Sequence, residues 1–174
     1  MPINYNTCRI CASGLLDDPQ LEGWYKCPSC CFSKIKLQYI TPTQYFMGRD
    51  KRFPKELTEE IQANVIILLE KVNAILYDLK TVEVEITSGW RPSAINSQIS
   101  NASKKSHHMT GCAVDIKDDD KQTLASKILT QPDLLAKYSL WLEDPSYTKG
   151  KNTNWVHLDI GTRADRDLRM FKPR

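Results

Sequence analysis

The placement of cysteine constrains this 174-residue chain more than any other feature. Five of its six cysteines lie within the first 31 residues, in the segments CRIC and CPSCC. Cys8, Cys11, Cys27 and Cys30 follow the spacing C-x2-C-x15-C-x2-C, which is typical of a four-thiolate zinc site. So short a segment buries too little apolar surface to fold alone, so a zinc ion would form its core. The sequence therefore predicts a zinc ribbon over residues 1–40.

Two alternatives to this ligand set remain open. Cys31 could replace Cys30 as the fourth ligand, because the two cysteines are adjacent. The cysteines could instead form two disulfides, but disulfides require an oxidising compartment. The opening segment MPINYNTCRI lacks the basic and then apolar start of a secretory signal, so we expect a protein that is made and folded in the cytoplasm or that leaves it by another route.

A connector and a larger domain follow the ribbon. Residues 41–54, TPTQYFMGRDKRFP, contain prolines, a glycine and a cluster of charges, and we expect them to link the ribbon to a domain over residues 55–174. Apolar residues then recur every three or four positions from residue 54 to residue 80, which predicts a long helix with Pro54 in its first turn.

The remainder of this domain alternates between strand and helix patterns. Residues 121–138 have helical periodicity that is interrupted at Pro132. Alternation of apolar and polar residues predicts strands in the segments VEVEIT, CAVDI, YSLWLE and WVHLDI. This grouping predicts an α+β domain whose mostly antiparallel sheet carries its helices on one side.

Charge and hydropathy exclude two classes of partner. Twenty-four lysines and arginines against 21 acidic residues leave a net charge of only +3, which is too small and dispersed to favour nucleic acid. No segment contains the roughly 18 consecutive apolar residues that a membrane-spanning helix requires. We therefore expect neither nucleic-acid binding nor membrane insertion.

Two of the predicted strands carry polar residues on a face that should be buried. Asp115 shares a face with Ala113, and His157 shares one with Trp155 and Asp159, because alternate residues of a strand point the same way. An unpaired aspartate or histidine on such a face is costly, so each requires a partner. A divalent zinc ion would satisfy an aspartate and two histidines together and keep one position open for water. Taken alone, however, a strand histidine is more often hydrogen-bonded structure than a metal ligand.

Three segments together resemble a known family. SGWRP, SHHMTGCAVD and WVHLD are similar to the motifs of the zinc D-alanyl-D-alanine carboxypeptidase family, which includes D,D-dipeptidases and phage L-alanyl-D-glutamate endolysins. The resemblance covers about residues 55–165 and implies the fold that these enzymes share with the hedgehog signalling domain. The family pattern S-x-H-x-x-G-x-A-x-D falls without gaps on Ser106, His108, Gly111, Ala113 and Asp115.

The resemblance also implies roles for individual residues. His108, Asp115 and His157 would be the three zinc ligands, and His107 would be a spacer. Arg91, in SGWRP, would polarise the scissile carbonyl and stabilise the oxyanion.

Two further residues are candidates for supporting this site. Ser106 could hold the loop that carries the first ligand. Asp159 lies two residues beyond the last histidine, on the same strand face, and could orient that imidazole.

One position departs from the family pattern. The general base of the family is a glutamate or aspartate three residues before the last histidine, and here that position is Asn154. A side-chain amide has no useful pKa and cannot take a proton from water. Either another carboxylate serves, for which Glu143 and Asp144 in WLEDPSY are candidates, or the domain is no longer an efficient peptidase.

The sequence therefore predicts a zinc-dependent peptidase that cleaves peptide bonds in peptidoglycan stem peptides, with one zinc ion in the peptidase-like site and one in the ribbon. The alternative is a catalytically impaired zinc-binding structural or cell-wall-binding module, such as a phage virion or tail component joined to a structural protein by its ribbon. Similarity to endolysins favours a phage-encoded protein that resides in the host cytoplasm before lysis, or in the virion.

Overall fold

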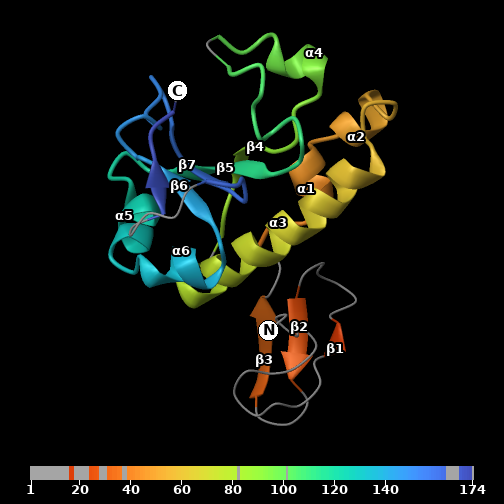
Figure 1. Ribbon diagram of the computed structural model, residues 1–174. Coiled ribbons are helices and arrows are strands. Elements are labelled where there is room, and N and C mark those ends of the chain that lie inside the picture. Colours follow the sequence, from red (N-terminus) through yellow and green to blue (C-terminus); the bar gives the residue numbers. More distant parts are fainter. Residues whose placement is uncertain are drawn as a thin grey trace.

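The computed structural model describes residues 39–81, 83–100, 102–163 and 169–173, together with the backbone of three short N-terminal strands (Figure 1). These strands form an antiparallel sheet in the order β1-β2-β3, with β1 at Leu16–Asp17, β2 at Trp24–Cys27 and β3 at Cys31–Lys36. The Cα atoms of Cys27 and Cys31 are register partners. Cys8, Cys11 and Cys30 lie outside the described residues, so the ribbon zinc site stays a prediction.

The larger domain is built on a five-stranded mixed sheet in the order β4-β5-β7-β6-β8. The pairings among β4, β5, β7 and β6 are antiparallel, and only β6 and β8 are parallel. This topology confirms the predicted α+β class with a mostly antiparallel sheet. The strands are β4 (Ile86–Ser88), β5 (Ala113–Asp118), β6 (Trp141–Glu143), β7 (Asn154–Asp159) and β8 (Met170–Phe171).

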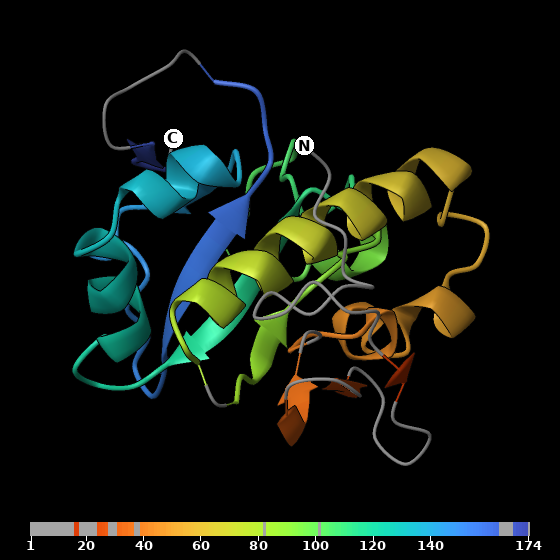
Figure 2. The same ribbon diagram turned by 90° about the horizontal axis from the view of Figure 1, so that it is seen from below.

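Helices cover one face of this sheet. The helix α3 (Glu59–Asp78) crosses the strands, and α5 (Thr123–Leu129) and α6 (Asp133–Lys137) pack on the same core (Figure 2). The sheet side of this core consists of alternate strand residues, because one face of each strand points toward the helices: Val114, Ile116, Leu142, Val156 and Leu158. Within the described residues, no helix is long and apolar enough to cross a membrane.

Several element boundaries differ from the sequence expectation. The long helix begins at Glu59 rather than near Pro54, because the Thr58 hydroxyl accepts a hydrogen bond from the Ile61 N–H and caps the helix. The strand predicted for VEVEIT is shortened to β4, and the two-residue β8 has no periodic pattern that predicts it. The interruption at Pro132 is confirmed, since α5 ends at Leu129 and α6 begins at Asp133.

The segment expected to be a connector packs on the domain. Residues 41–54 contain α1 (Pro42–Phe46) and α2 (Arg49–Arg52). Tyr45 is fully buried, and its hydroxyl donates to the Ala113 carbonyl at 2.9 Å. Gly89 allows the Tyr45 backbone to approach, because a Cβ at position 89 would lie 1.9 Å from the Tyr45 carbonyl oxygen. The core therefore extends back to Tyr39 and Ile40.

Asn73 on α3 anchors this N-terminal edge of the core. Its Oδ1 accepts from the N–H groups of Tyr39 and Ile40 at 2.7 and 2.8 Å, and its Nδ2 donates to the Ile40 carbonyl at 3.0 Å. Asn73→Ala would remove the side-chain hydrogen bonds of three buried backbone groups and is expected to lower the free energy of unfolding by about 2–4 kcal/mol. Denaturant unfolding measures the change. An effect below about 0.5 kcal/mol would show that residues 39 and 40 do not depend on this side chain.

Candidate metal centre

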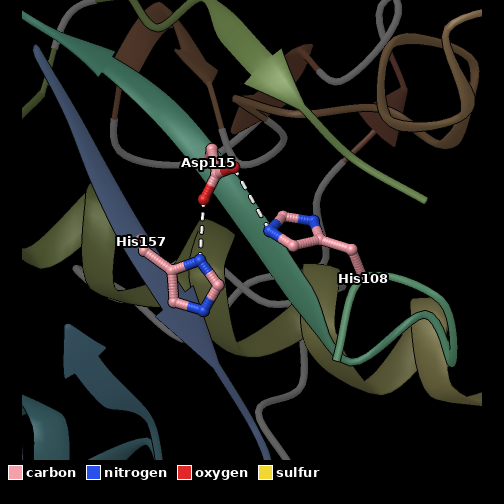
Figure 3. Close-up of side chains that lie close together, drawn as sticks. All are labelled: His108, Asp115 and His157. Atoms are coloured by element: carbon pink, nitrogen blue, oxygen red, sulfur yellow. Dashed lines mark hydrogen bonds and ion pairs between the residues drawn. The ribbon is translucent and has the colours of Figure 1, made fainter. Parts of the chain in front are cut away.

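Three side chains from separate segments converge on the sheet face opposite the helices (Figure 3). Asp115 on β5 and His157 on β7 are register partners, and both point away from the core because Val114 and Val156 beside them point into it. His108 reaches the same point from the loop before β5. The potential ligand atoms of the three residues all lie within 4.8 Å of one another.

The protonation of His108 suits a metal ligand. Its Nδ1 lies 2.8 Å from the Gly89 carbonyl oxygen, which can only accept, so Nδ1 carries the proton. Burial lowers the pKa of His108, although Asp115 acts in the opposite direction. The lowered pKa favours the neutral ring. Its Nε2 lone pair is then buried, has no hydrogen-bond partner among the described residues, and faces Asp115 Oδ2 at 3.2 Å. A nitrogen lone pair and a carboxylate oxygen at this distance can share a cation, so the residues fit a divalent metal ion.

Asp115 is the centre of the polar cluster. Its Oδ1 accepts from His157 Nδ1 at 2.7 Å, and its Oδ2 accepts from Arg91 Nη2 at 2.6 Å. Burial acts to raise the pKa of Asp115, but the side chains that its carboxylate contacts, among them the protonated His157, hold the pKa well below its usual range. The carboxylate is therefore ionised and available to a cation.

His157 lies between two carboxylates. Besides the contact with Asp115, its Nε2 lies 3.3 Å from Asp159 Oδ2. Burial lowers the pKa of His157, but hydrogen bonds to Asp115 and Asp159 outweigh burial and raise the pKa to about 10. His157 thus holds a proton in the metal-free site, and a metal ion would take the place of that proton.

Residues 49–159 match the family model described as Peptidase M15. The chain belongs to the peptidase M15 family. Membership confirms the resemblance read from the three motifs, and the M15 domain contains the whole His108, Asp115 and His157 cluster. The chain is therefore a member of a metallopeptidase family with a candidate zinc site. No curated protein matches it.

Hydrogen bonds to Ser106 hold the loop before β5 that carries His108. The Ser106 hydroxyl accepts from the His108 N–H at 3.4 Å, and the Ser106 carbonyl accepts from the Met109 N–H at 2.9 Å. His107 is more than a spacer, because its Nδ1 lies 3.3 Å from Asp159 Oδ2. No sequence pattern indicates this contact between residues more than fifty positions apart.

Arg91 lies against the cluster of His108, Asp115 and His157. Its Nε donates to the Ser88 hydroxyl at 2.7 Å while Nη2 donates to Asp115. Two fixed donors set the plane of the guanidinium, so its position beside the cluster is well defined.

Asn154 occupies the position of the family's general base, but the structure places it away from His157. Asn154 begins β7 opposite Asp118, and its Nδ2 donates to the Asp119 carbonyl at 3.1 Å. Three positions along a strand turn its side chain to the face opposite that of His157. The structure therefore does not bring Asn154 to the cluster of His108, Asp115 and His157.

Glu143, by contrast, lies beside the cluster. The register pairs Trp141 with Asp159 and Leu142 with Leu158, so the next residue, Glu143, falls beside His157 on the same face. Burial raises the pKa of Glu143, and the carboxylates of Asp115 and Asp159 act in the same direction against His157 and Arg163. A carboxyl group with a raised pKa next to a metal site has the properties of a general base.

Asn154 offers a direct test of this geometry. We expect Asn154→Asp to change peptidase activity far less than the roughly hundredfold that gain or loss of a general base produces, because the side chain points away from the metal cluster. Steady-state hydrolysis of a stem peptide measures the effect. A hundredfold increase in kcat would instead show that position 154 can supply the base.

Proposed function

We propose that this M15 domain is a zinc-dependent peptidase that cleaves peptide bonds in peptidoglycan stem peptides. The observation that supports it most strongly is the buried Nε2 lone pair of His108, which faces the ionised Asp115 beside His157. Zinc bound by these residues would supply a Lewis acid that polarises the scissile carbonyl and activates water. Membership in the M15 family and similarity to endolysin motifs support the substrate class.

Two residues of the chain complete the proposed chemistry. Glu143 takes the proton from the attacking water and passes it to the leaving amine, which is the work of the family's carboxylate at the position that Asn154 occupies here. Arg91 stabilises the developing oxyanion. Its Nε and Nη2 are held by Ser88 and Asp115, so Nη1 is the donor that faces the substrate carbonyl.

A catalytically impaired module is the second candidate. Asn154 in place of the usual base favours it, and such a module would bind zinc or cell wall as a structural part of a phage virion or tail. In either case we propose a phage-encoded protein that resides in the host cytoplasm before lysis or in the virion, with a second zinc ion in the cysteine ribbon that attaches it to a partner.

The deciding experiment measures zinc content and amino-group release together. Zinc-loaded full-length protein is incubated with purified peptidoglycan or a synthetic stem peptide, with His108→Ala as the matched variant. We expect two zinc ions per chain and release of amino groups, and loss of one zinc and of the release in His108→Ala. A folded protein that binds the His108-dependent zinc but releases nothing would support the impaired module.

A further inference from the structure

A segment beyond the M15 match contributes to the metal centre. The match ends at Asp159, yet the chain continues past Arg163 and returns as β8 at the edge of the sheet. Both terminal nitrogens of Arg163 donate to the two oxygens of the Asp159 carboxylate, with Nη2 to Oδ2 at 2.7 Å. The Gly161 N–H donates to the same carboxylate at 2.9 Å. Asp159 is fully buried, and Arg163 supplies it with a compensating charge.

Aromatic rings fix Arg163 in place. Its guanidinium carbon lies 3.7 Å from the centre of the Phe171 ring and 5.5 Å from that of Trp141. The Phe171 ring also meets the His157 ring edge-on, with 5.9 Å between centres. One aromatic ring of the C-terminal strand therefore touches both the proposed metal ligand and the arginine that holds the neighbouring carboxylate.

Backbone pairing holds Phe171 at this position. β8 runs parallel to β6 with Phe171 opposite Glu143, and the Asp144 N–H donates to the Phe171 carbonyl at 2.8 Å. The Leu142 N–H donates to the Arg169 carbonyl at 3.0 Å. The backbone of Phe171 is thus fixed by the sheet.

Asp159 connects this segment to both histidine-bearing elements. Its Oδ2 lies 3.3 Å from His107 Nδ1 and 3.3 Å from His157 Nε2. The His107 ring packs directly on Gly161, where a Cβ would lie 1.9 Å from the ring carbon Cε1. A single carboxylate therefore joins the ligand loop, the ligand strand and the C-terminal segment.

We propose that Asp159, Arg163 and Phe171 form a C-terminal clamp that positions the His157 ring for metal binding. The bidentate guanidinium fixes the plane of the Asp159 carboxylate, and that carboxylate with the Phe171 edge fixes the orientation of the imidazole. These are positioning residues, because none of them supplies a ligand. The inference rests on the proposed function, since it takes the cluster of His108, Asp115 and His157 to be the zinc site.

The test is the zinc affinity of the full chain in competition with a chelator, with His108→Ala identifying the zinc ion that belongs to this site. Arg163→Gln is expected to weaken this affinity by about 10- to 100-fold. Arg163→Lys keeps the charge but loses the two-pronged contact, so it should recover only part of the loss. Arg169→Gln is the matched control, because Arg169 stacks on Trp141 at 4.5 Å and donates to the Leu140 carbonyl instead of to Asp159.

Two further measurements separate positioning from a general loss of structure. In an Asp159→Asn background, Arg163→Gln should cause no additional loss of affinity, because the clamp acts through that carboxylate. Phe171→Leu keeps an apolar side chain at the site, and it should shift the visible absorption of the Co²⁺-substituted protein even if Arg163→Gln does not fold.

The outcomes distinguish this inference from the proposed function. Unchanged zinc affinity in folded Arg163→Gln, or an unchanged Co²⁺ spectrum in Phe171→Leu, would overturn the clamp and leave the proposed peptidase intact. An additional loss in the Asp159→Asn background would also overturn it. Wild-type protein without a His108-dependent zinc ion would overturn both.

Discussion

Asp115→Ala is expected to remove the zinc ion of the M15 site and to lower peptidase activity by at least about a thousandfold. Asp115 contacts His108, His157 and Arg91. Its loss therefore removes one proposed ligand and also the contacts that hold His108 and His157, the other two proposed ligands. A catalytic metal ion contributes several kcal/mol of transition-state stabilisation, and each 1.36 kcal/mol is about tenfold in rate. Metal analysis and amino-group release from a stem peptide measure the two effects.

Asp118→Asn provides the matched control for Asp115→Ala. Asp118 is a second buried aspartate on β5, but its carboxylate accepts from the N–H groups of Leu124 and Ala125 at the start of α5. Its amide analogue should therefore lower stability while zinc content and activity persist. If Asp115→Ala retained its zinc ion, the proposed ligand set would be wrong.

The strand faces of the site were predictable from the sequence. Alternation along each strand predicted that Asp115 shares a face with Ala113, and His157 one with Trp155 and Asp159. The structure adds the register, which pairs Asp115 with His157 on the side opposite the helices. The motif spacing added His108, which lies on a loop that has no periodicity of its own. Local pattern and family motif together were therefore sufficient for the three residues of the metal cluster.

The surroundings of the cluster were not predictable in the same way. His107 contacts Asp159 only because β7 ends beside the ligand loop, and β8 is two residues long and depends entirely on its pairing with β6. Residues 41–54 resemble a linker in composition, yet Tyr45 is buried because Gly89 allows its backbone to approach closely. Each of these contacts joins segments far apart in the chain, so no local pattern encodes it.

The general base could not be identified by counting residues back from His157. Counting three residues back from His157 leads to Asn154, but a regular strand turns that side chain to the other face, and its pairing with Asp118 shows that β7 is regular there. Glu143 is fourteen residues before His157 and reaches the same face through the β6 and β7 pairing. Strand register therefore identifies a carboxylate that linear spacing does not.

Glu143→Gln should consequently lower kcat by about a hundred- to ten-thousandfold while zinc binding is retained. The glutamine keeps the size of the side chain but cannot accept a proton from water. Hydrolysis of a stem peptide across a pH series, with zinc content measured in parallel, tests both parts of this expectation. Asp144→Asn is the matched control, because that neighbouring carboxylate accepts from the N–H and hydroxyl of Ser146. It should leave kcat unchanged.

The pH dependence gives a second, independent sign of the same role. A general base acts when it is deprotonated, so activity must fall as pH falls through the pKa of Glu143. Burial raises the pKa of Glu143 in the metal-free protein, and a bound zinc ion would act in the opposite direction, so the test is the presence of the acidic limb rather than its position. Residual activity of Glu143→Gln should lack this limb. A variant with full activity and an unchanged profile would assign the base to a group other than Glu143.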